Sequence, residues 1–367
     1  MLIVLGKLCK FAIIFSFLVE TVGGVLQSAR AVRQGKIIVA GATGRIGSLV
    51  VEDLLRRNQN AANESISVSV VAAVRNVEKA NKMFSNILPD IEIVKCDLNA
   101  PKDIDKICKE ADGVIFCATG FSQASSVWDK IASVFALSLS PKKLMDVTAL
   151  SQIGKAMVGK PNSVCENGPS VVLCSSAGVT RPTWSDDKKI RLIGAADIPI
   201  VRLNPFDVLG GKRQSEEALR ASGARYCIVR PCGLNNNWPA GRPILSQGDV
   251  AVGRTNLKDA AAILVDAMLD STAVQKTFES ITMPGLPKPL SYTEQLSRMS
   301  KDGEKQMSEE TLFAQYSILQ QLVPGETLAP NKLAMGQTYD QLDKGEAGRL
   351  GERGAERAPI VRETYSR

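Results

Sequence analysis

The stretch that decides the fold is KIIVAGATGRIGSLVVEDLLRRN, residues 36–58. Residues 36–40 are mainly apolar and β-branched, which predicts a short buried strand. The apolar residues of 46–58 recur at helical spacing and predict an amphipathic helix. Three glycines, each three residues from the next, stand where the strand passes into the helix.

This glycine turn has the properties of a phosphate-binding loop. Glycine lacks a Cβ, so the backbone can turn tightly, approach a pyrophosphate and let the helix pack close to the strand. The start of the helix adds unpaired N–H groups and the positive end of its dipole. A mere tight turn is the alternative, but the position between strand and helix favours a dinucleotide site. The predicted contacts are Gly41, Thr43, Gly44, Arg45, Ile46 and Gly47.

The rest of the chain alternates in the same way. Apolar runs without polar alternation, separated by helical stretches, are typical of a parallel sheet covered on both faces. The sequence therefore predicts an α/β fold with a doubly wound parallel sheet. Further strands are expected at 67–75, 91–98, 112–120, 169–178 and 224–233, with helices that include 149–157 and 214–222.

The end of the second predicted strand bears on the choice of cofactor. An acidic residue there would accept a hydrogen bond from the free ribose 2′-hydroxyl of NAD. Here the strand ends AAVRN, with Arg75 and no carboxylate. A guanidinium suits a 2′-phosphate, and Arg45 could add to it. This pattern predicts NADP(H), although a solvated arginine at a strand end would look the same.

Composition excludes several kinds of chemistry. The chain has 367 residues, a formal net charge of +7 and no histidine. A histidine-based zinc site and Ser-His or Cys-His catalysis are therefore impossible. Its eight cysteines include no CxxC pair, and several lie in apolar runs, so no metal site is expected and the fold needs no disulfides. The positive charge gathers near the N-terminus, which gives little support to nucleic-acid binding.

The first 34 residues look like a targeting presequence and are left out of the predicted fold. Lys7 and Lys10 precede an apolar run at 11–19, which is too short to span a membrane. The stretch 22–35 has Arg and Ser but no acid. This order resembles a bipartite plastid presequence; a secretory signal or an N-terminal membrane anchor is the alternative. We expect the mature chain to begin between residues 20 and 36, without a membrane span.

Seven motifs together resemble a known family. GATGRIG, AAVRN, VKCDL, VIFCATG, VLCSSAG, the region of Lys212 and RYCIVRPCGL occur in the order typical of atypical short-chain dehydrogenase/reductases. The closest likeness is to the NmrA-like, NAD(P)-binding Rossmann group with many plastid members. The predicted domain covers residues 35–282. The resemblance implies that Asp97 approaches the adenine, that Ala118, Thr119 and Gly120 follow the ribose, and that Pro231 lies near the nicotinamide. The family often has glycine where Cys232 stands.

The resemblance also implies a catalytic pair but no complete active site. Carbonyl-reducing members use a Tyr-x-x-x-Lys helix and a serine after the fifth strand. Ser176 matches the serine and Lys212 the lysine, while Val208 stands in place of the tyrosine. Tyr226 lies in the sixth strand and does not match. Both polar residues also have structural readings: a solvated helix lysine, and a serine that satisfies the backbone at a strand end.

Three tryptophans follow predicted strands. Trp128, Trp184 and Trp238 come after the fourth, fifth and sixth strands. Because ligands bind beyond the carboxyl ends of such strands, these rings could line a substrate pocket. They could equally close hydrophobic seams under long loops.

The C-terminal part changes character. Residues 278–281 are expected to add a last short strand, and 290–301 and 308–323 read as helices within a segment 283–326. Residues 327–367 are rich in Gly, Glu and Arg, which predicts a flexible charged tail. Residues 283–367 could bind a protein partner.

Two functions agree with these patterns. One is an NADPH-dependent reductase of a small acceptor that needs no positioned acid, such as a quinone, a flavin or a conjugated double bond. The other is a non-catalytic NADP(H)-binding redox sensor or assembly factor that holds a partner through the C-terminal extension. The intact glycine loop agrees with both.

Overall fold

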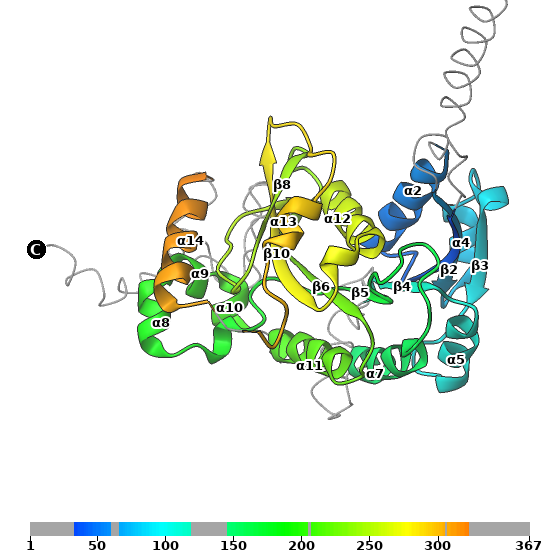
Figure 1. The fold of residues 1–367 in the computed structure, drawn as a ribbon, viewed down its shortest axis with the longest axis horizontal. Coiled ribbons are helices and arrows are strands. Elements are labelled where there is room, and N and C mark those ends of the chain that lie inside the picture. The colour runs from blue at the N-terminus through cyan, green and yellow to red at the C-terminus, as the bar shows by residue number, and fades with distance from the viewer. Residues whose placement is uncertain (1–32, 60–65, 119–144, 205–206, 305–306, 323–367) are drawn as a thin grey trace, which may run out of the picture.

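The computed structural model describes residues 33–59, 66–118, 145–204, 207–304 and 307–322 (Figure 1). Its centre is an eight-stranded sheet in the order β3-β2-β1-β4-β5-β6-β10-β8, and a small second sheet pairs β7 with β9. The strands are β1 (Arg33–Ala40), β2 (Ile66–Val74), β3 (Ile91–Lys95), β4 (Gly113–Phe116), β5 (Val171–Cys174), β6 (Tyr226–Pro231), β7 (Leu234–Asn235), β8 (Gly241–Ser246), β9 (Thr255–Asn256) and β10 (Lys276–Pro284).

The predicted doubly wound sheet is confirmed. All seven strands from β3 to β10 in the sheet order run parallel to one another. Strand β1 lies between β2 and β4. The order therefore reverses at β1, which is the place where such sheets bind ligands. The edge strand β8 is antiparallel to β10 and was not foreseen. Strand β1 begins at Arg33, two residues inside the predicted presequence.

Helices cover both faces of the sheet. Helices α2 and α12 lie on one face, while α5, α7 and α11 line the other, as Figure 1 shows. The main helices are α2 (Arg45–Gln59), α4 (Val77–Met83), α5 (Pro101–Lys109), α7 (Met145–Met157), α8 (Asp186–Arg191), α9 (Ile193–Ala196), α10 (Pro199–Leu203), α11 (Val208–Arg220), α12 (Leu257–Leu269), α13 (Thr293–Ser297) and α14 (Glu309–Leu322).

The first strand shows how the sequence builds this sandwich. Ile37 and Val39 pack into the α2/α12 layer, whereas Ile38 and Ala40 pack into the α7/α11 layer. All four are at most 1% exposed. A strand buried on both faces needs apolar residues at every position, and each large one contributes roughly 2 kcal/mol when it leaves water.

The predicted helix at 290–301 is much shorter than expected. Helix α13 ends at Ser297 because backbone groups that would continue it form hydrogen bonds with side chains from elsewhere in the fold. The ammonium of Lys276 donates to the carbonyl of Leu296, and the N–H of Ser300 donates to Gln247 Oε1 at 3.0 Å. In a longer α-helix, the N–H of Ser300 would instead donate to the carbonyl of Leu296. Helix α14 matches the other predicted helix within one residue.

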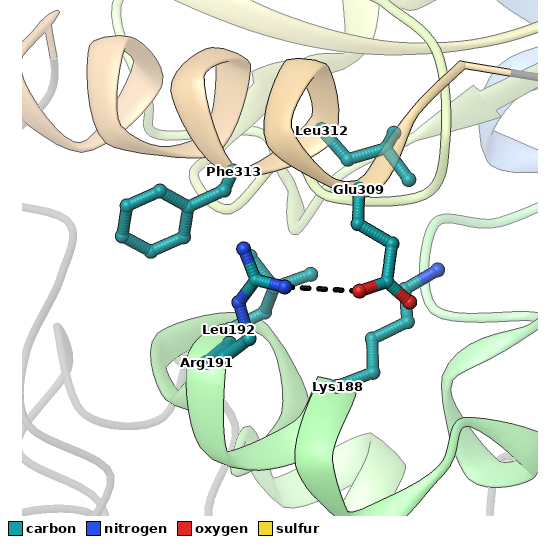
Figure 2. A pocket seen from close by; sticks show the side chains of 6 residues that line it. All are labelled: Lys188, Arg191, Leu192, Glu309, Leu312 and Phe313. Carbon is teal, nitrogen blue, oxygen red and sulfur yellow. Dashed lines mark hydrogen bonds and ion pairs between the residues drawn. The ribbon is translucent and has the colours of Figure 1, made fainter.

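Helix α14 packs against α8 at one end of the molecule (Figure 1), and Figure 2 shows the side chains of this contact. Arg191 forms an ion pair of 2.9 Å with Glu309, and its guanidinium lies 5.6 Å from the ring centroid of Phe313. The N–H of Gly194 donates to the hydroxyl of Tyr316 at 3.0 Å. These contacts attach the C-terminal helix to the segment that follows β5. Within the described ranges, no helix combines the length and apolar character that crossing a membrane requires.

Candidate functional site: a dinucleotide cleft

Gly41 and Gly47 make the turn between β1 and α2 possible. Gly41 has φ +80°, and a Cβ there would come within 2.7 Å of the backbone of Ala118. A Cβ on Gly47 would lie 2.2 Å from the carbonyl oxygen of Gly41. The first glycine thus lets β1 and the end of β4 approach each other, and the second lets the helix start directly over the turn.

The open side of the turn carries Gly44 and Arg45. Both are exposed, while Thr43 is half-buried beside them. Helix α2 begins at Arg45 and has no acidic residue in its first turn, which leaves the positive dipole end uncompensated. Ile46 is only 7% exposed and its side chain packs in the core. Of the predicted contacts, Ile46 can therefore offer its backbone N–H but not its side chain.

Arg75 and Asp97 lie at the same edge of the sheet. Arg75 follows β2, Asp97 follows β3, and both are exposed. The N–H and side-chain amide of Asn99 donate to Asp97 at 3.0 Å each and lower the pKa of this carboxyl, and Arg75 lowers it further. The guanidinium is therefore near a carboxylate but still open to solvent, where an incoming phosphate could reach it.

A small pocket lies next to the start of the glycine turn. Ala118, which approaches Gly41, also lines this pocket at the carboxyl ends of β4 and β5. Lys212 lines it from α11 and is half-buried. The remaining lining residues come from the strand ends, α7 and α11: Phe116, Asp146, Leu150, Leu173, Cys174, Ser175 and Ser215. Thr119 and Gly120 lie outside the described residues.

Lys212 supplies positive charge at the strand ends. Burial raises the pKa of the Cys174 thiol to about 11, and the nearby Lys212 opposes that rise. Val208 stands at the start of α11, four residues before Lys212, and so lies one turn away on the same helix face. A tyrosine at that position would stand beside the lysine; valine has no proton to offer.

The structure places Ser175, rather than Ser176, in the pocket. Ser175 Oγ donates to Glu216 Oε1 at 2.6 Å, and Ser175 is 6% exposed. Ser176 is half-buried outside the lining, and its hydroxyl donates to the carbonyl of Ala177 at 3.0 Å. The predicted serine is thus one residue away from the serine that lines the same pocket as Lys212.

None of the tyrosines within the described residues lines this pocket. Tyr226 is the first residue of β6, so it lies at the amino end of the strand, whereas the pocket lies at the carboxyl ends of β4 and β5. Its hydroxyl donates to Asp302 at 3.0 Å. Burial and this carboxylate raise the pKa of Tyr226 well above its usual value. Tyr316 belongs to the α14 contact and Tyr292 to the core.

Strand β6 ends at Pro231, two residues before the predicted end of this strand at 233, and the next residue does not line the pocket. The carbonyl of Pro231 accepts the N–H of Ala177 at 3.2 Å. Cys232 is 3% exposed, and its thiol donates to the carbonyl of Ala251 at 3.3 Å. Cys232 therefore packs in the hydrophobic cluster that also contains Leu319 of α14. Cys232 is not among the residues that line the Lys212 pocket.

Of the two described tryptophans, Trp184 packs in a hydrophobic cluster and Trp238 is half-buried beneath the guanidinium of Arg254. Trp184 is 8% exposed, and its Nε1 donates to Thr180 Oγ1 at 3.2 Å. Trp238 donates to the carbonyl of Thr282 at 3.0 Å. Neither lines the pocket at Lys212. Trp128 lies outside the described residues. The seven described cysteines carry free thiols, and no cluster suited to a metal occurs among the residues that the structure places.

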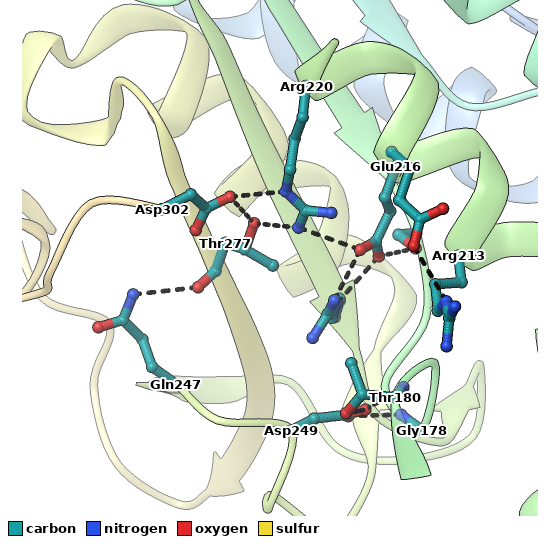
Figure 3. A network of polar contacts seen from close by, with 12 residues as sticks. Gly178, Thr180, Arg213, Glu216, Arg220, Gln247, Asp249, Thr277 and Asp302 are labelled. Carbon is teal, nitrogen blue, oxygen red and sulfur yellow. Dashed lines mark hydrogen bonds and ion pairs between the residues drawn. The ribbon is translucent and has the colours of Figure 1, made fainter. Parts of the chain in front are cut away.

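A buried charge network was not predicted (Figure 3). Glu216 is fully buried and accepts two hydrogen bonds from Arg230, at 2.9 and 2.6 Å. Asp249, 1% exposed, accepts the N–H groups of Gly178 and Thr180 at 2.6 and 2.7 Å. The available signal was a charge inside an apolar strand, as in CIVRP, because such a charge requires a buried partner.

A glycine turn at the switch point of a parallel sheet, with a lysine-lined pocket beside it, defines a dinucleotide-binding α/β protein. The chain belongs to the NAD(P)H-binding family, which it matches over residues 41–271. This match confirms the Rossmann-type, short-chain dehydrogenase/reductase-like classification and the binding of NAD(P)H.

Named relatives are chloroplast proteins. An uncharacterized chloroplastic protein of Arabidopsis thaliana is 27% identical over 267 residues, which cover 71% of this chain and 82% of the relative. The chloroplastic protein TIC 62 of Pisum sativum is 27% identical over 230 residues, 59% of this chain but only 36% of that protein. Among solved structures, a short-chain dehydrogenase/reductase of Veillonella parvula in complex with NADP aligns with a TM-score of 0.46 and 16% identity, over 70% of this chain and 99% of the other.

Proposed function

We propose that the protein is an NADPH-dependent reductase whose acceptor needs no positioned acid, such as a quinone, a flavin or a conjugated double bond. The observation that carries this proposal is the position of Ala118. It touches the glycine turn on one side and lines the Lys212 pocket on the other. A dinucleotide with its pyrophosphate at α2 would thus place its nicotinamide half over the pocket. The cofactor supplies the hydride, and the protein supplies orientation.

Lys212 would hold the ribose of the nicotinamide half. An ammonium has three donors and no acceptor, which suits sugar hydroxyls. No tyrosine accompanies it in the described pocket, so a proton would come from water or from the acceptor itself. Acceptors whose reduced form is stable as an anion tolerate this arrangement, whereas simple ketones do not.

Arg75 is expected to select NADPH over NADH. We predict at least about tenfold tighter binding of NADPH, because the exposed guanidinium can pair with the 2′-phosphate. Arg75→Ala should remove most of this preference. The matched control is Arg56→Ala, an exposed arginine in the last turn of α2. Calorimetry with both cofactors measures the effect; equal affinities of the wild type would refute the assignment.

Val208 is expected to limit the protein to acceptors that need no positioned acid. General acid catalysis typically contributes about 10²–10⁴-fold, and valine cannot provide it. We predict negligible NADPH oxidation with plain ketones and aldehydes, and measurable oxidation with a quinone or flavin. Val208→Tyr should create weak carbonyl reduction if the ring reaches Lys212, and Val208→Ile serves as the control for size. Stopped-flow kinetics across acceptor classes tests this; rapid ketone turnover by the wild type would contradict it.

A second function, an NADP(H)-binding sensor or assembly factor, is favoured by the α14 end of the molecule. Phe313, Ile318 and Leu322 on α14 are 43%, 57% and 41% exposed. Apolar groups displayed in this way suit a protein partner. Micromolar NADPH binding without turnover of any acceptor would support this function over the reductase.

The plastid is the proposed location. The support is the N-terminal order of lysines, apolar run and acid-free stretch, together with the chloroplastic names of relatives. The chain purified from plastids should begin between residues 20 and 36, since targeting peptides are removed. N-terminal sequencing decides this, and a native chain that starts at Met1 would overturn it.

A further inference from the structure

The hydroxyl protons of the pocket serines are already used inside the protein. Ser175 Oγ donates to Glu216 at 2.6 Å, and Ser215 Oγ donates to the carbonyl of Gly211 at 3.0 Å. A serine hydroxyl has one proton and two lone pairs. Both serines can therefore only accept a hydrogen bond from a group bound in the pocket.

Glu216 fixes the direction of the Ser175 hydrogen bond. It is wholly buried in α11, and besides the two hydrogen bonds from Arg230 it accepts one from Arg220 at 3.2 Å. A carboxylate held by two guanidinium groups accepts hydrogen bonds and has no proton to return. Ser175 consequently cannot reverse its hydroxyl without leaving a buried charge short of a partner, which is costly.

We propose that Glu216 holds Ser175 as a hydrogen-bond acceptor for the bound dinucleotide, which donates an O–H or N–H of its nicotinamide half to it. This inference rests on the proposed cofactor site. Lys212, which lines the same pocket, only donates, so the two residues together match a group that both donates and accepts hydrogen bonds. A ribose hydroxyl and the nicotinamide carboxamide are such groups. Ser175 is then a binding residue, Glu216 a positioning residue, and neither protonates the acceptor.

The first test removes the lone pairs of Ser175. In the full chain, Ser175→Ala should weaken NADPH binding about three- to tenfold, the usual effect of losing one neutral hydrogen bond. Ser175→Thr keeps the hydroxyl and should restore most of the affinity. Ser176→Ala is the matched control, since that neighbouring hydroxyl lies outside the pocket lining. Unchanged NADPH affinity of Ser175→Ala would overturn the inference.

The second test asks whether Glu216 acts through Ser175. The amide of Glu216→Gln can donate to Ser175, which lets the serine proton turn toward the ligand. This substitution should weaken NADPH binding in the wild-type background and add nothing in Ser175→Ala. A purely structural role would give additive losses and would refute the positioning role. If Glu216→Gln does not fold, the three serine variants still decide the binding role of Ser175.

A cofactor analogue identifies the donating group. The 3-acetylpyridine analogue of NADPH lacks the amide N–H. If Ser175→Ala costs nothing with this analogue, the carboxamide is the donor; if the cost persists, the ribose is, and either result supports the inference. Loss of affinity in Arg75→Ala but none in Ser175→Ala rejects this inference alone. Absence of NADPH binding to the wild type rejects the proposed function as well.

Discussion

Gly47→Ala is expected to destabilise the protein by about 3 kcal/mol or more and to abolish measurable NADPH binding. The new Cβ would stand 2.2 Å from the carbonyl oxygen of Gly41, 2.8 Å from its carbonyl carbon and 2.9 Å from Cα of Ala42. All three atoms are backbone, so no flexible side chain can yield. Either α2 moves away from the sheet or the turn opens, and both changes displace the N–H groups that would hold the pyrophosphate.

Gly44→Ala is the matched control in the same turn. A Cβ at Gly44 would meet only the carbonyl oxygen of Gly41, at 3.1 Å, and the residue is exposed with no positive φ. We expect a stability change within about 1 kcal/mol, together with weaker NADPH binding because the methyl would face the ligand. Urea unfolding and calorimetry measure the two effects. Equal stability of the two variants would show that helix α2 is not packed as described.

Glu279→Gln is expected to stabilise the protein at pH 8 by on the order of 3 kcal/mol and to leave its stability near pH 4 almost unchanged. Glu279 is wholly buried on β10, and its Oε1 has no hydrogen bond from the described residues. Burial and the nearby Asp249 raise the pKa of Glu279 to about 7, although Arg230, Ser246 and Arg181 oppose the rise. The native protein therefore retains this proton at a pH where the unfolded chain has lost it.

The sign follows from proton linkage. The folded pKa lies above the unfolded value of 4.5, so the stability from this group is fully present below pH 4.5. It is lost as the pH rises through about 7, where the buried carboxyl must ionise. Glutamine keeps the shape of the neutral acid and does not titrate.

Unfolding in urea from pH 4 to pH 9 measures this difference. The control is Glu217→Gln, an exposed carboxylate on α11 that pairs with Arg213 at 3.0 Å. Its curve should run parallel to that of the wild type, while the Glu279→Gln curve diverges above pH 5. Parallel curves for Glu279→Gln would mean that Glu279 is already ionised in the native protein through most of this range.

Sequence patterns could predict the candidate cofactor site because its requirements are local. The strand, the three-glycine turn and the helix are consecutive, and each depends on neighbours within a few residues. Arg75 could be placed in the same way, since the residue after a parallel strand lies at the carboxyl edge whatever the sheet order. The choice of NADP(H) that Arg75 suggests remains a prediction for the binding experiment.

The pocket could not be read from the sequence with equal accuracy. Successive side chains along a strand, and in the residues just after it, point to opposite faces of the sheet. An error of one residue at the end of β5 therefore exchanges Ser175 for Ser176. The motif VLCSSAG does not show where the strand stops. The tertiary contact with Glu216 on α11 makes the distinction visible.

The sequence by itself determined the class of fold, the order of strand, turn and helix, and the absence of histidine chemistry. These follow from periodicity and composition, which act over short stretches of chain. Tertiary structure alone decided that Ser175 and Lys212 line one pocket, that Tyr226 pairs with Asp302 at the amino end of β6, and that Trp184 packs in a hydrophobic cluster. It also brought Glu279 beside Asp249, two acids 30 residues apart. Each of these depends on which strands become neighbours, and the free energy of burying the whole core settles that pairing.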